Sequence, residues 1–284
     1  MKLGIIAGVY TEDLDKFEKE LRAVKSYGYD CIDYQGFMDT ETHLWHMSDT
    51  DFESFLKRQR EIAEQIGLTI HQTHGPWRWP ICDTTEEDRA ERFEKMAKAI
   101  RGTVFLGARY MVLHNLMPFG RVDTDPDVVR SINKDFFERL CKIGEENGVI
   151  ICLENMPFPG QVLARPVDTV AFVRELNTPW LRVCLDVGHA TTLGVPAGDA
   201  VRQIGKEYLA VMHVHDNDGK GDLHWRPFTG VTDWLGFSEA LGEIDFDGVI
   251  SLETQVSKNL SAEEYDAAQR LLFSCVQRIS ENCK

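Results

Sequence analysis

Histidines and acids stand at comparable places along this chain, late in short apolar runs or in the loops that follow them. Seven of the nine histidines follow this pattern: His71, His74, His114, His189, His213, His215 and His224. Three acids end the later runs in the same way: Glu154, Asp186 and Glu253. Imidazole and carboxylate groups bind divalent cations and transfer protons near neutral pH. A single acid at the end of a strand usually faces solvent or caps a helix, but repetition over six successive runs indicates a shared site.

The apolar runs that precede these residues have the length and composition of β-strands. Eight of them alternate with longer, acid-led amphipathic segments, which is typical of β-α units with a parallel sheet. We expect strands at residues 3–10, 31–36, 68–74, 110–116, 149–155, 181–187, 209–215 and 248–254. Eight units of about 35 residues fit 284 residues, so the sequence predicts a single (β/α)8 TIM barrel that occupies residues 1–284 as one domain. The strands of such a barrel end at one rim, where the histidines and acids would converge.

The composition is that of a globular chain and disfavours several classes of partner. Hydrophobic residues make up 43% and charged residues 27%, which excludes extended disorder. Acids outnumber bases by 46 to 31, and the net charge of -15 disfavours nucleic acid as a partner. No apolar run approaches the ~20 residues of a membrane span, so we expect no membrane association. The seven cysteines are odd in number and form no C-x-x-C pair, from which we expect reduced thiols and a cytoplasmic protein. The composition is compatible with a homo-oligomer as well as with a monomer.

Four of these residues form a set suited to one divalent metal ion: Glu154, Asp186, His213 and Glu253. Three carboxylates and an imidazole are mostly hard donors, appropriate for Mn²⁺, Zn²⁺, Co²⁺ or Mg²⁺. Without a cation, three carboxylates at one rim would repel one another, and at least one of them would become protonated. Side chains alternate between the two faces of a strand, so His213 and His215 should point the same way. The alternative is a rim of unrelated capping residues.

Four strings carry a family resemblance: Leu153-Glu154-Asn155, Cys184-Leu185-Asp186-Val187-Gly188-His189, Met212-His213-Val214-His215-Asp216-Asn217, and Asp222-Leu223-His224 ahead of Gly230 and Asp233-Trp234. In order and spacing they resemble the xylose isomerase-like barrels, which are sugar and sugar-phosphate isomerases and epimerases, with the type IV apurinic endonucleases as relatives. The resemblance implies that the four-residue set binds the metal. It also implies that Glu154 and Glu253 transfer protons on either side of the substrate, and that His189 holds a substrate hydroxyl.

The endonuclease relatives use nine ligands for three zinc ions, and this chain matches all nine: His74, His114, Glu154, Asp186, His189, His213, Asp222, His224 and Glu253. This match does not separate the branches, because sugar isomerases can keep many of these residues with one metal. The loops at residues 74–80 and 216–222 resemble the isomerase branch and lack the basic run that would track a phosphate backbone. We therefore expect one metal ion, with substrate bound by Trp77 and by six polar residues: His74, His114, His189, His215, Asp222 and His224.

The paired glutamates and the resemblance predict an isomerase or epimerase of a small ketose, aldose or hydroxy-keto acid. Such a reaction removes a weakly acidic C–H proton, with a divalent ion as Lewis acid for the enediolate that results. Which carbon Glu154 and Glu253 can reach decides whether the product is an isomer or an epimer. A metal-promoted hydride shift is an alternative to proton transfer. Two alternatives are a trinuclear-zinc phosphodiesterase acting on abasic DNA and a barrel that binds a sugar without turning it over. No nucleotide cofactor is expected, because the glycines around Lys220 lack a phosphate-binding pattern.

Overall fold

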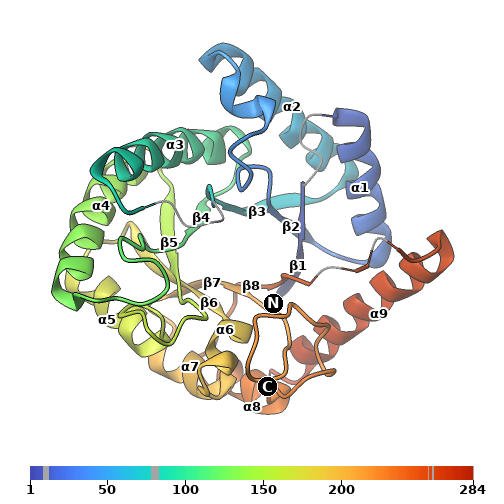
Figure 1. The fold of residues 1–284 in the computed structure, drawn as a ribbon. Coiled ribbons are helices and arrows are strands. Elements are labelled where there is room, and N and C mark those ends of the chain that lie inside the picture. Colours follow the sequence, from blue (N-terminus) through green and yellow to red (C-terminus); the bar gives the residue numbers. More distant parts are fainter. Residues whose placement is uncertain (9–12, 78–82, 255, 258, 284) are drawn as a thin grey trace.

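The computed structural model describes residues 1–8, 13–77, 83–254, 256–257 and 259–283. Its parallel strands form one sheet in the order β7-β6-β5-β4-β3-β2-β1-β8. The strands are β1 Lys2–Ala7, β2 Cys31–Tyr34, β3 Thr69–His74, β4 Tyr110–Leu113, β5 Ile150–Glu154, β6 Leu181–Asp186, β7 Leu209–His213 and β8 Val249–Leu252. Helices surround this sheet (Figure 1). The (β/α)8 barrel expected from the sequence is confirmed.

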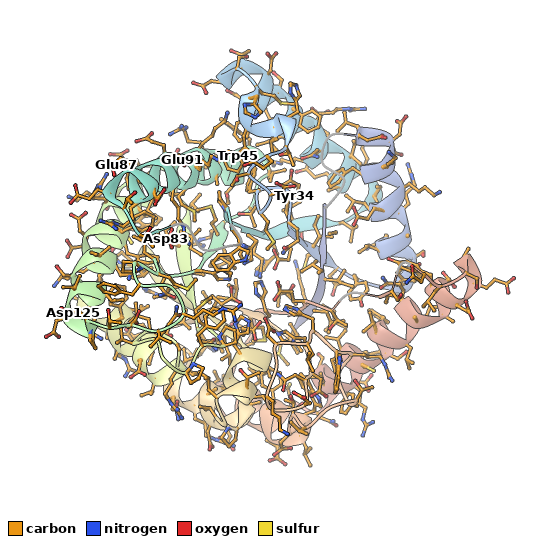
Figure 2. The ribbon with its side chains drawn as sticks, viewed as in Figure 1. Tyr34, Trp45, Asp83, Glu87, Glu91 and Asp125 are labelled. Atoms are coloured by element: carbon orange, nitrogen blue, oxygen red, sulfur yellow. The ribbon has the colours of Figure 1, made fainter. Side chains whose placement is uncertain are left out.

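The helices lie on the outside of the barrel, where all but α9 stand between successive strands in the chain. They are α1 Leu14–Tyr27, α2 Asp49–Ile66, α3 Glu86–Phe105, α4 Pro126–Asn147, α5 Pro166–Leu176, α6 Val187–Thr192, α7 Ala197–Ile204, α8 Trp234–Glu243 and α9 Ala262–Glu281, with a short 3-10 helix η1 at His43–His46. Their boundaries follow local signals. α3 begins with a capping box of Thr85 and Asp88, and α4 ends at Gly148 with a φ of 71°. Glu87 and Glu91 of α3 lie on the outer surface of the ring of helices (Figure 2).

The barrel closes between β7 and β8 through a residue that follows β7. The N–H of Val214 donates to the carbonyl of Ser251 at 2.9 Å, and the N–H of Glu253 donates to the carbonyl of Val214 at 3.1 Å. On its other edge, β8 pairs with β1. All strands run in the same direction, so their carboxyl ends share one rim.

All eight predicted strands are present, but seven of them end before the predicted residue; β3 ends at His74 as expected. Burial continues beyond the paired backbone, so the pattern of apolar residues predicted strands that are too long. Leu116, predicted to end a strand, is fully buried, yet its N–H donates to Oδ1 of Asn133 at 2.7 Å and not to a neighbouring strand. Residues 9 and 10, predicted to end the first strand, lie outside the described residues. Apolar composition therefore marks what is buried, not where pairing stops.

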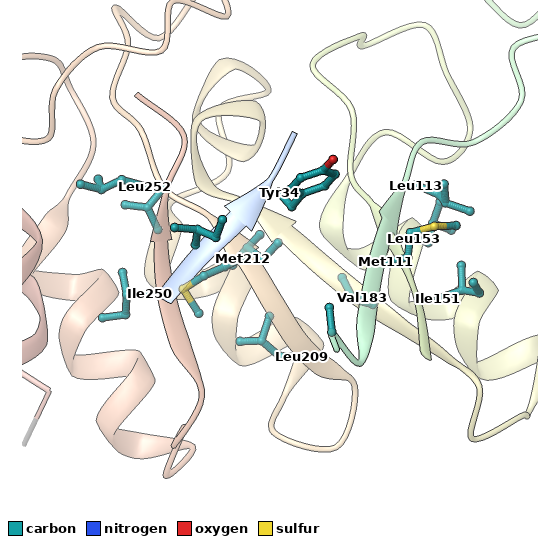
Figure 3. Close-up of a cluster of buried hydrophobic side chains, with 14 of the residues drawn as sticks. Tyr34, Met111, Leu113, Ile151, Leu153, Val183, Leu209, Met212, Ile250 and Leu252 are labelled. Carbon is teal, nitrogen blue, oxygen red and sulfur yellow. The ribbon is translucent and has the colours of Figure 1, made fainter. Parts of the chain in front are cut away.

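Alternation of side chains along the strands separates the barrel interior from the layer beneath the helices. Ile151 and Leu153 of β5 belong to the large apolar cluster between strands and helices (Figure 3). Cys152 points the other way, into a small cluster with Val112, Cys184 and Val211. Because the period is two, Glu154 stands on the same interior face as Cys152, one pleat nearer the rim. The polar site thus rests on an apolar layer.

Two expectations from composition concern these elements. Among the described helices, none combines the length and apolar character needed to cross a bilayer. The described cysteines are free thiols: Cys31, Cys141, Cys152, Cys184, Cys275 and Cys283. Cys82 lies outside the described residues.

Candidate active site

The four predicted metal ligands come together at the carboxyl-terminal rim of the barrel. Glu154, Asp186 and His213 are the last residues of β5, β6 and β7, and Glu253 directly follows β8. One ligand atom from each residue lies within 4.8 Å of those of the others. All four side chains are buried, and Glu253 is the most exposed at 9%. We refer to these four residues as the central cluster.

Each ring nitrogen of His213 faces at least one carboxylate. Nδ1 is 2.9 Å from Oε1 of Glu154 and 3.2 Å from Oε2 of Glu253. Nε2 is 2.8 Å from Oδ2 of Asp33 on β2. Burial opposes a charge on the ring, but Cys184, Glu253 and Glu154 outweigh burial and raise the pKa of His213 well above its usual value. The surroundings of this ring therefore favour a positive charge, whether a proton or a cation.

Asp33 was not singled out from the sequence. It is fully buried and also accepts a hydrogen bond from Nε2 of Gln72 at 2.9 Å. The available signal was an acid inside the short run Cys31-Ile32-Asp33-Tyr34, because a buried strand seldom holds a carboxylate without a partner. The identity of that partner could not be read locally, since His213 is 180 residues away.

Glu154 also contacts two histidines through its second oxygen. Oε2 is 2.9 Å from Nε2 of His114 and 3.5 Å from Nε2 of His74. Burial alone would raise the pKa of Glu154, but His213 and His114 lower it well below its usual value. Burial lowers the pKa of His114 to about 4, so this ring is neutral at pH 7 and donates Nε2–H to the carboxylate. Glu154 is accordingly ionised at neutral pH.

A second group of titratable side chains, the outer cluster, adjoins the first: His189, His215, Asp222 and His224. Asp222 lies 3.3 Å from Nε2 of His189 through Oδ2 and 3.2 Å from Nε2 of His224 through Oδ1. Burial opposes a charge on His189, but Asp186 and Asp222 raise its pKa to about 10. Burial likewise opposes a charge on His224, whereas Asp222 and Glu253 raise its pKa to about 10. The outer cluster is thus a network of ion pairs whose ligand atoms could also hold a cation.

Asp186 joins the two clusters. It is the N-cap of α6, where Oδ1 accepts the N–H of His189 at 2.6 Å, and its Oδ2 lies 3.1 Å from Nε2 of His215. Gly188 makes room for this contact, because a Cβ at that position would lie 1.9 Å from Cε1 of His215. The string 184–189 therefore combines a predicted metal ligand, a helix cap and a close approach within six residues.

The loop between β7 and α8 carries Asp222 and His224, and the buried Asp216 holds this loop in place. The carboxylate of Asp216 accepts N–H groups from Gly230 at 2.9 Å, Thr232 at 3.1 Å and Nε1 of Trp234 at 3.0 Å. Its backbone N–H and carbonyl both pair with Trp225 at 2.8 Å. The side chain of Asp216 thus fixes the end of this loop at residues 230–234, and the backbone of Asp216 fixes its middle at Trp225.

Both clusters adjoin a cavity of about 420 Å³ at the rim. The ring of Trp77 forms part of its wall, with the ring centroid 4.4 Å from that of His114 and the planes at 86°. Residues not predicted from the sequence complete the lining: Ile6, Gln35, Met38, Met156, Pro157, Phe158 and Leu223. Most of these additions are apolar, and the described lining includes no Lys or Arg. Arg78 and Trp79, on the same loop as Trp77, lie outside the described residues.

The structure places every predicted site residue at this rim. Eight of them line the cavity: His74, Trp77, His114, Glu154, His189, Asp222, His224 and Glu253. The other three, Asp186, His213 and His215, are fully buried beneath its surface. Their roles in catalysis, metal binding and substrate binding stay predictions.

The donors of the central cluster fit a divalent cation. Its three carboxylates are buried, and within the described part of the chain their ion pairs are made with histidines and not with Lys or Arg. Burying several anions together is costly unless a cation compensates them. An oxygen-rich set with one imidazole is appropriate for Mn²⁺, Mg²⁺, Co²⁺ or Zn²⁺.

With fold and site defined, the class of protein is clear. A family model described as the xylose isomerase-like TIM barrel matches residues 21–275. The chain belongs to this family, as the resemblance of its motifs implied.

Individual relatives agree with this class. An uncharacterized protein of Methanocaldococcus jannaschii is 31% identical over 187 residues, an alignment that covers 62% of this chain and 62% of that protein, less than two thirds of its length. D-psicose 3-epimerase of Agrobacterium fabrum is 23% identical over 297 residues, covering 96% of this chain and 98% of the enzyme. The crystal structure of D-psicose 3-epimerase with D-tagatose from Clostridium cellulolyticum H10 aligns with a TM-score of 0.75 at 16% identity over 99% of both chains, which supports the fold.

Proposed function

We propose that this protein is a divalent-metal-dependent isomerase or epimerase of a small sugar. The observation that carries the proposal is the approach of two buried glutamates, Glu154 and Glu253, to one nitrogen of His213 beside a cavity. Proton transfer at a carbon next to a carbonyl needs a group that removes the proton and a group that returns it. The alignment with a D-psicose 3-epimerase over nearly its whole length supports a sugar as the substrate.

The central cluster would hold the cation, and the glutamates would carry the proton. When bound, a divalent ion supplies Lewis acidity toward the oxygen that gains charge. Burial raises the pKa of Glu253, whereas histidines lower that of Glu154 despite its burial. Two carboxylates whose surroundings move their pKa values in opposite directions are suited to acid and base roles. One of the two glutamates would remove the C–H proton and the other would return one, with the roles exchanged in the reverse reaction.

The remaining polar groups at the rim would bind the hydroxyls of the sugar. His189 and Asp222 face the cavity, as do His74 and His114. Trp77 would cover an apolar face of the sugar and exclude water. Because the described lining holds no Lys or Arg, and because the chain carries a net charge of -15, a neutral sugar fits this cavity better than a phosphorylated one.

The test is a panel of ketoses, aldoses and hydroxy-keto acids incubated in D₂O with Mn²⁺ and followed by NMR. Deuterium at the carbon next to the carbonyl, together with a new epimer or isomer, is the expected result. A product without deuterium would favour a hydride shift over proton transfer. Sugars that bind without exchange or conversion would favour the third alternative, a barrel that only binds.

A second candidate, a trinuclear-zinc phosphodiesterase, is favoured by one specific observation. Eight of the nine residues that match the endonuclease ligands lie in three adjoining groups: His74 with Glu154 and His213, the central cluster, and the outer cluster, which also contains His215. His114, the remaining residue of the nine, is 2.9 Å from Glu154. Three zinc ions per chain with cleavage of an abasic oligonucleotide would establish this function in place of the first.

A further inference from the structure

We infer that Asp33 is a positioning residue for the candidate metal site, because its carboxylate holds the ring of His213 so that Nδ1, and not Nε2, faces the cation. This inference rests on the proposed function, since it assumes that the central cluster binds a divalent ion. Asp33 itself lies on the far side of the His213 ring from Glu154 and Glu253, and it contacts this ring through Nε2.

The sheet places Asp33 for this contact. β2 and β3 pair in parallel, with a shift of register between Ile32 and Asp33 that sets Asp33 opposite Gln72 instead of His71. A bulge of this kind redirects side chains. As a result, Oδ2 of Asp33 accepts from Nε2 of Gln72 at 2.9 Å and from Nε2 of His213, across the barrel on β7, at 2.8 Å. All three side chains are fully buried, so solvent does not compete for these bonds.

The hydrogen bond determines which nitrogen is free to bind a metal. A neutral imidazole carries one N–H, and a carboxylate at Nε2 fixes the hydrogen there. The lone pair then resides on Nδ1, which already faces Glu154 at 2.9 Å and Glu253 at 3.2 Å. A carboxylate on the far nitrogen of a ligating histidine orients the ring and increases its basicity.

The negative charge of Asp33 should strengthen cation binding, in addition to the effect of its hydrogen bond on the orientation of His213. Within the described residues, the partners of its carboxylate are His213 and Gln72, and Oδ1 has no hydrogen-bond partner. No Lys or Arg in that part of the chain forms an ion pair with it. A fully buried carboxylate placed in this way adds negative charge next to a site that would hold a dication. Asp33→Asn removes this charge while keeping an oxygen in nearly the same place.

The experiment compares cobalt binding by the wild-type chain and Asp33→Asn. Both proteins are stripped with a chelator and titrated with Co²⁺ in competition with a chromophoric chelator. We expect the affinity for Co²⁺ to fall about 10- to 100-fold in Asp33→Asn. The matched control is Asp83→Asn, which removes the charge of another buried aspartate, the partner of Arg92. This control should lower the melting temperature and leave the Co²⁺ affinity unchanged.

A second measurement does not depend on the stability of the variant. In the zinc-loaded wild-type protein, the ¹⁵N spectrum of the histidine side chains should show His213 with its hydrogen on Nε2. A hydrogen on Nδ1, or wild-type Co²⁺ affinity in folded Asp33→Asn, would overturn the inference. If the wild-type chain itself bound no divalent ion, the metal dependence in the proposed function would fail first, and the role of Asp33 would fall with it.

Discussion

Glu154 and Glu253 approach the same atom from two strands of the barrel, with Oε1 of Glu154 at 2.9 Å and Oε2 of Glu253 at 3.2 Å from Nδ1 of His213. The two carboxylates differ in what else they contact. Glu154 is surrounded by histidines and has a lowered pKa, whereas Glu253 has a raised pKa because of its burial. The two carboxylates therefore have different surroundings, although both approach one ring nitrogen.

Replacing Glu154 by glutamine should abolish turnover of the sugar substrate. The amide is neither a base nor a strong metal ligand, so we expect kcat to fall by about 10²- to 10⁴-fold even at saturating Mn²⁺. Stopped-time NMR assays of product and of deuterium incorporation measure the effect. Glu239→Gln, an exposed glutamate on α8, is the matched control and should keep full activity. Near-normal turnover in the Glu154 variant would remove this residue from the mechanism.

Removal of the metal ion with a chelator should abolish activity and lower the free energy of unfolding. The central cluster holds three buried carboxylates near one another, and without the ion their charges repel. An ion present at 100 times its Kd adds about 2.7 kcal/mol to the free energy of unfolding. We therefore expect the Tm to drop after treatment with a chelator and to recover with Mn²⁺ or Co²⁺. Elemental analysis should find about one ion per chain. Three tightly held zinc ions would support the phosphodiesterase instead.

The ion pair of Asp222 with His224 should make the stability of the chelated protein depend on pH. The pKa of His224 is raised in the folded chain from 6.5 to about 10, against the effect of burial, by Asp222 and Glu253. A raised histidine pKa contributes stability that is fully present below about pH 6.5 and is lost as the pH rises through 10. Since the imidazole is 33% exposed, solvent screening limits the contribution to about 1 kcal/mol.

Calorimetry between pH 6 and 10 tests this dependence. The Tm of the wild-type chain should decline over this range more steeply than that of His224→Asn, in which the titrating group is gone. Parallel curves for the two proteins would show that this pair does not titrate as expected.

Gly188→Ala should disturb the contact between α6 and the outer cluster. A Cβ at position 188 would lie 1.9 Å from Cε1 of His215, so the ring must leave its place beside Asp186. Overpacking of this kind costs about 1–3 kcal/mol, which lowers the Tm by several degrees. Gly221→Ala is the matched control, because the nearest atom to a Cβ there is Cδ2 of Leu223, at 3.3 Å. Equal melting temperatures for the two variants would contradict the close packing at Gly188.

The strands were predictable because their signal is local. Five successive apolar residues at 149–153 indicate a strand covered on both faces, and β5 indeed spans Ile150–Glu154. The ends of strands were less predictable. Leu116 is as buried as any strand residue, but its N–H bonds to a side chain of α4, and nothing in its neighbourhood in the sequence encodes that choice.

By itself, the sequence determined the repeating strands and helices, and hence the rim at which strand-terminal acids and histidines gather. It did so because the alternation of side chains and the direction of parallel strands follow from local backbone geometry. Only the tertiary structure decided which atoms meet. The contact of Asp33 with His213 joins residues from β2 and β7, and the apolar lining at Met38, Met156 and Leu223 comes from separate loops. Such contacts depend on register, on the closure of the barrel and on loop paths, which result from the packing of the whole chain.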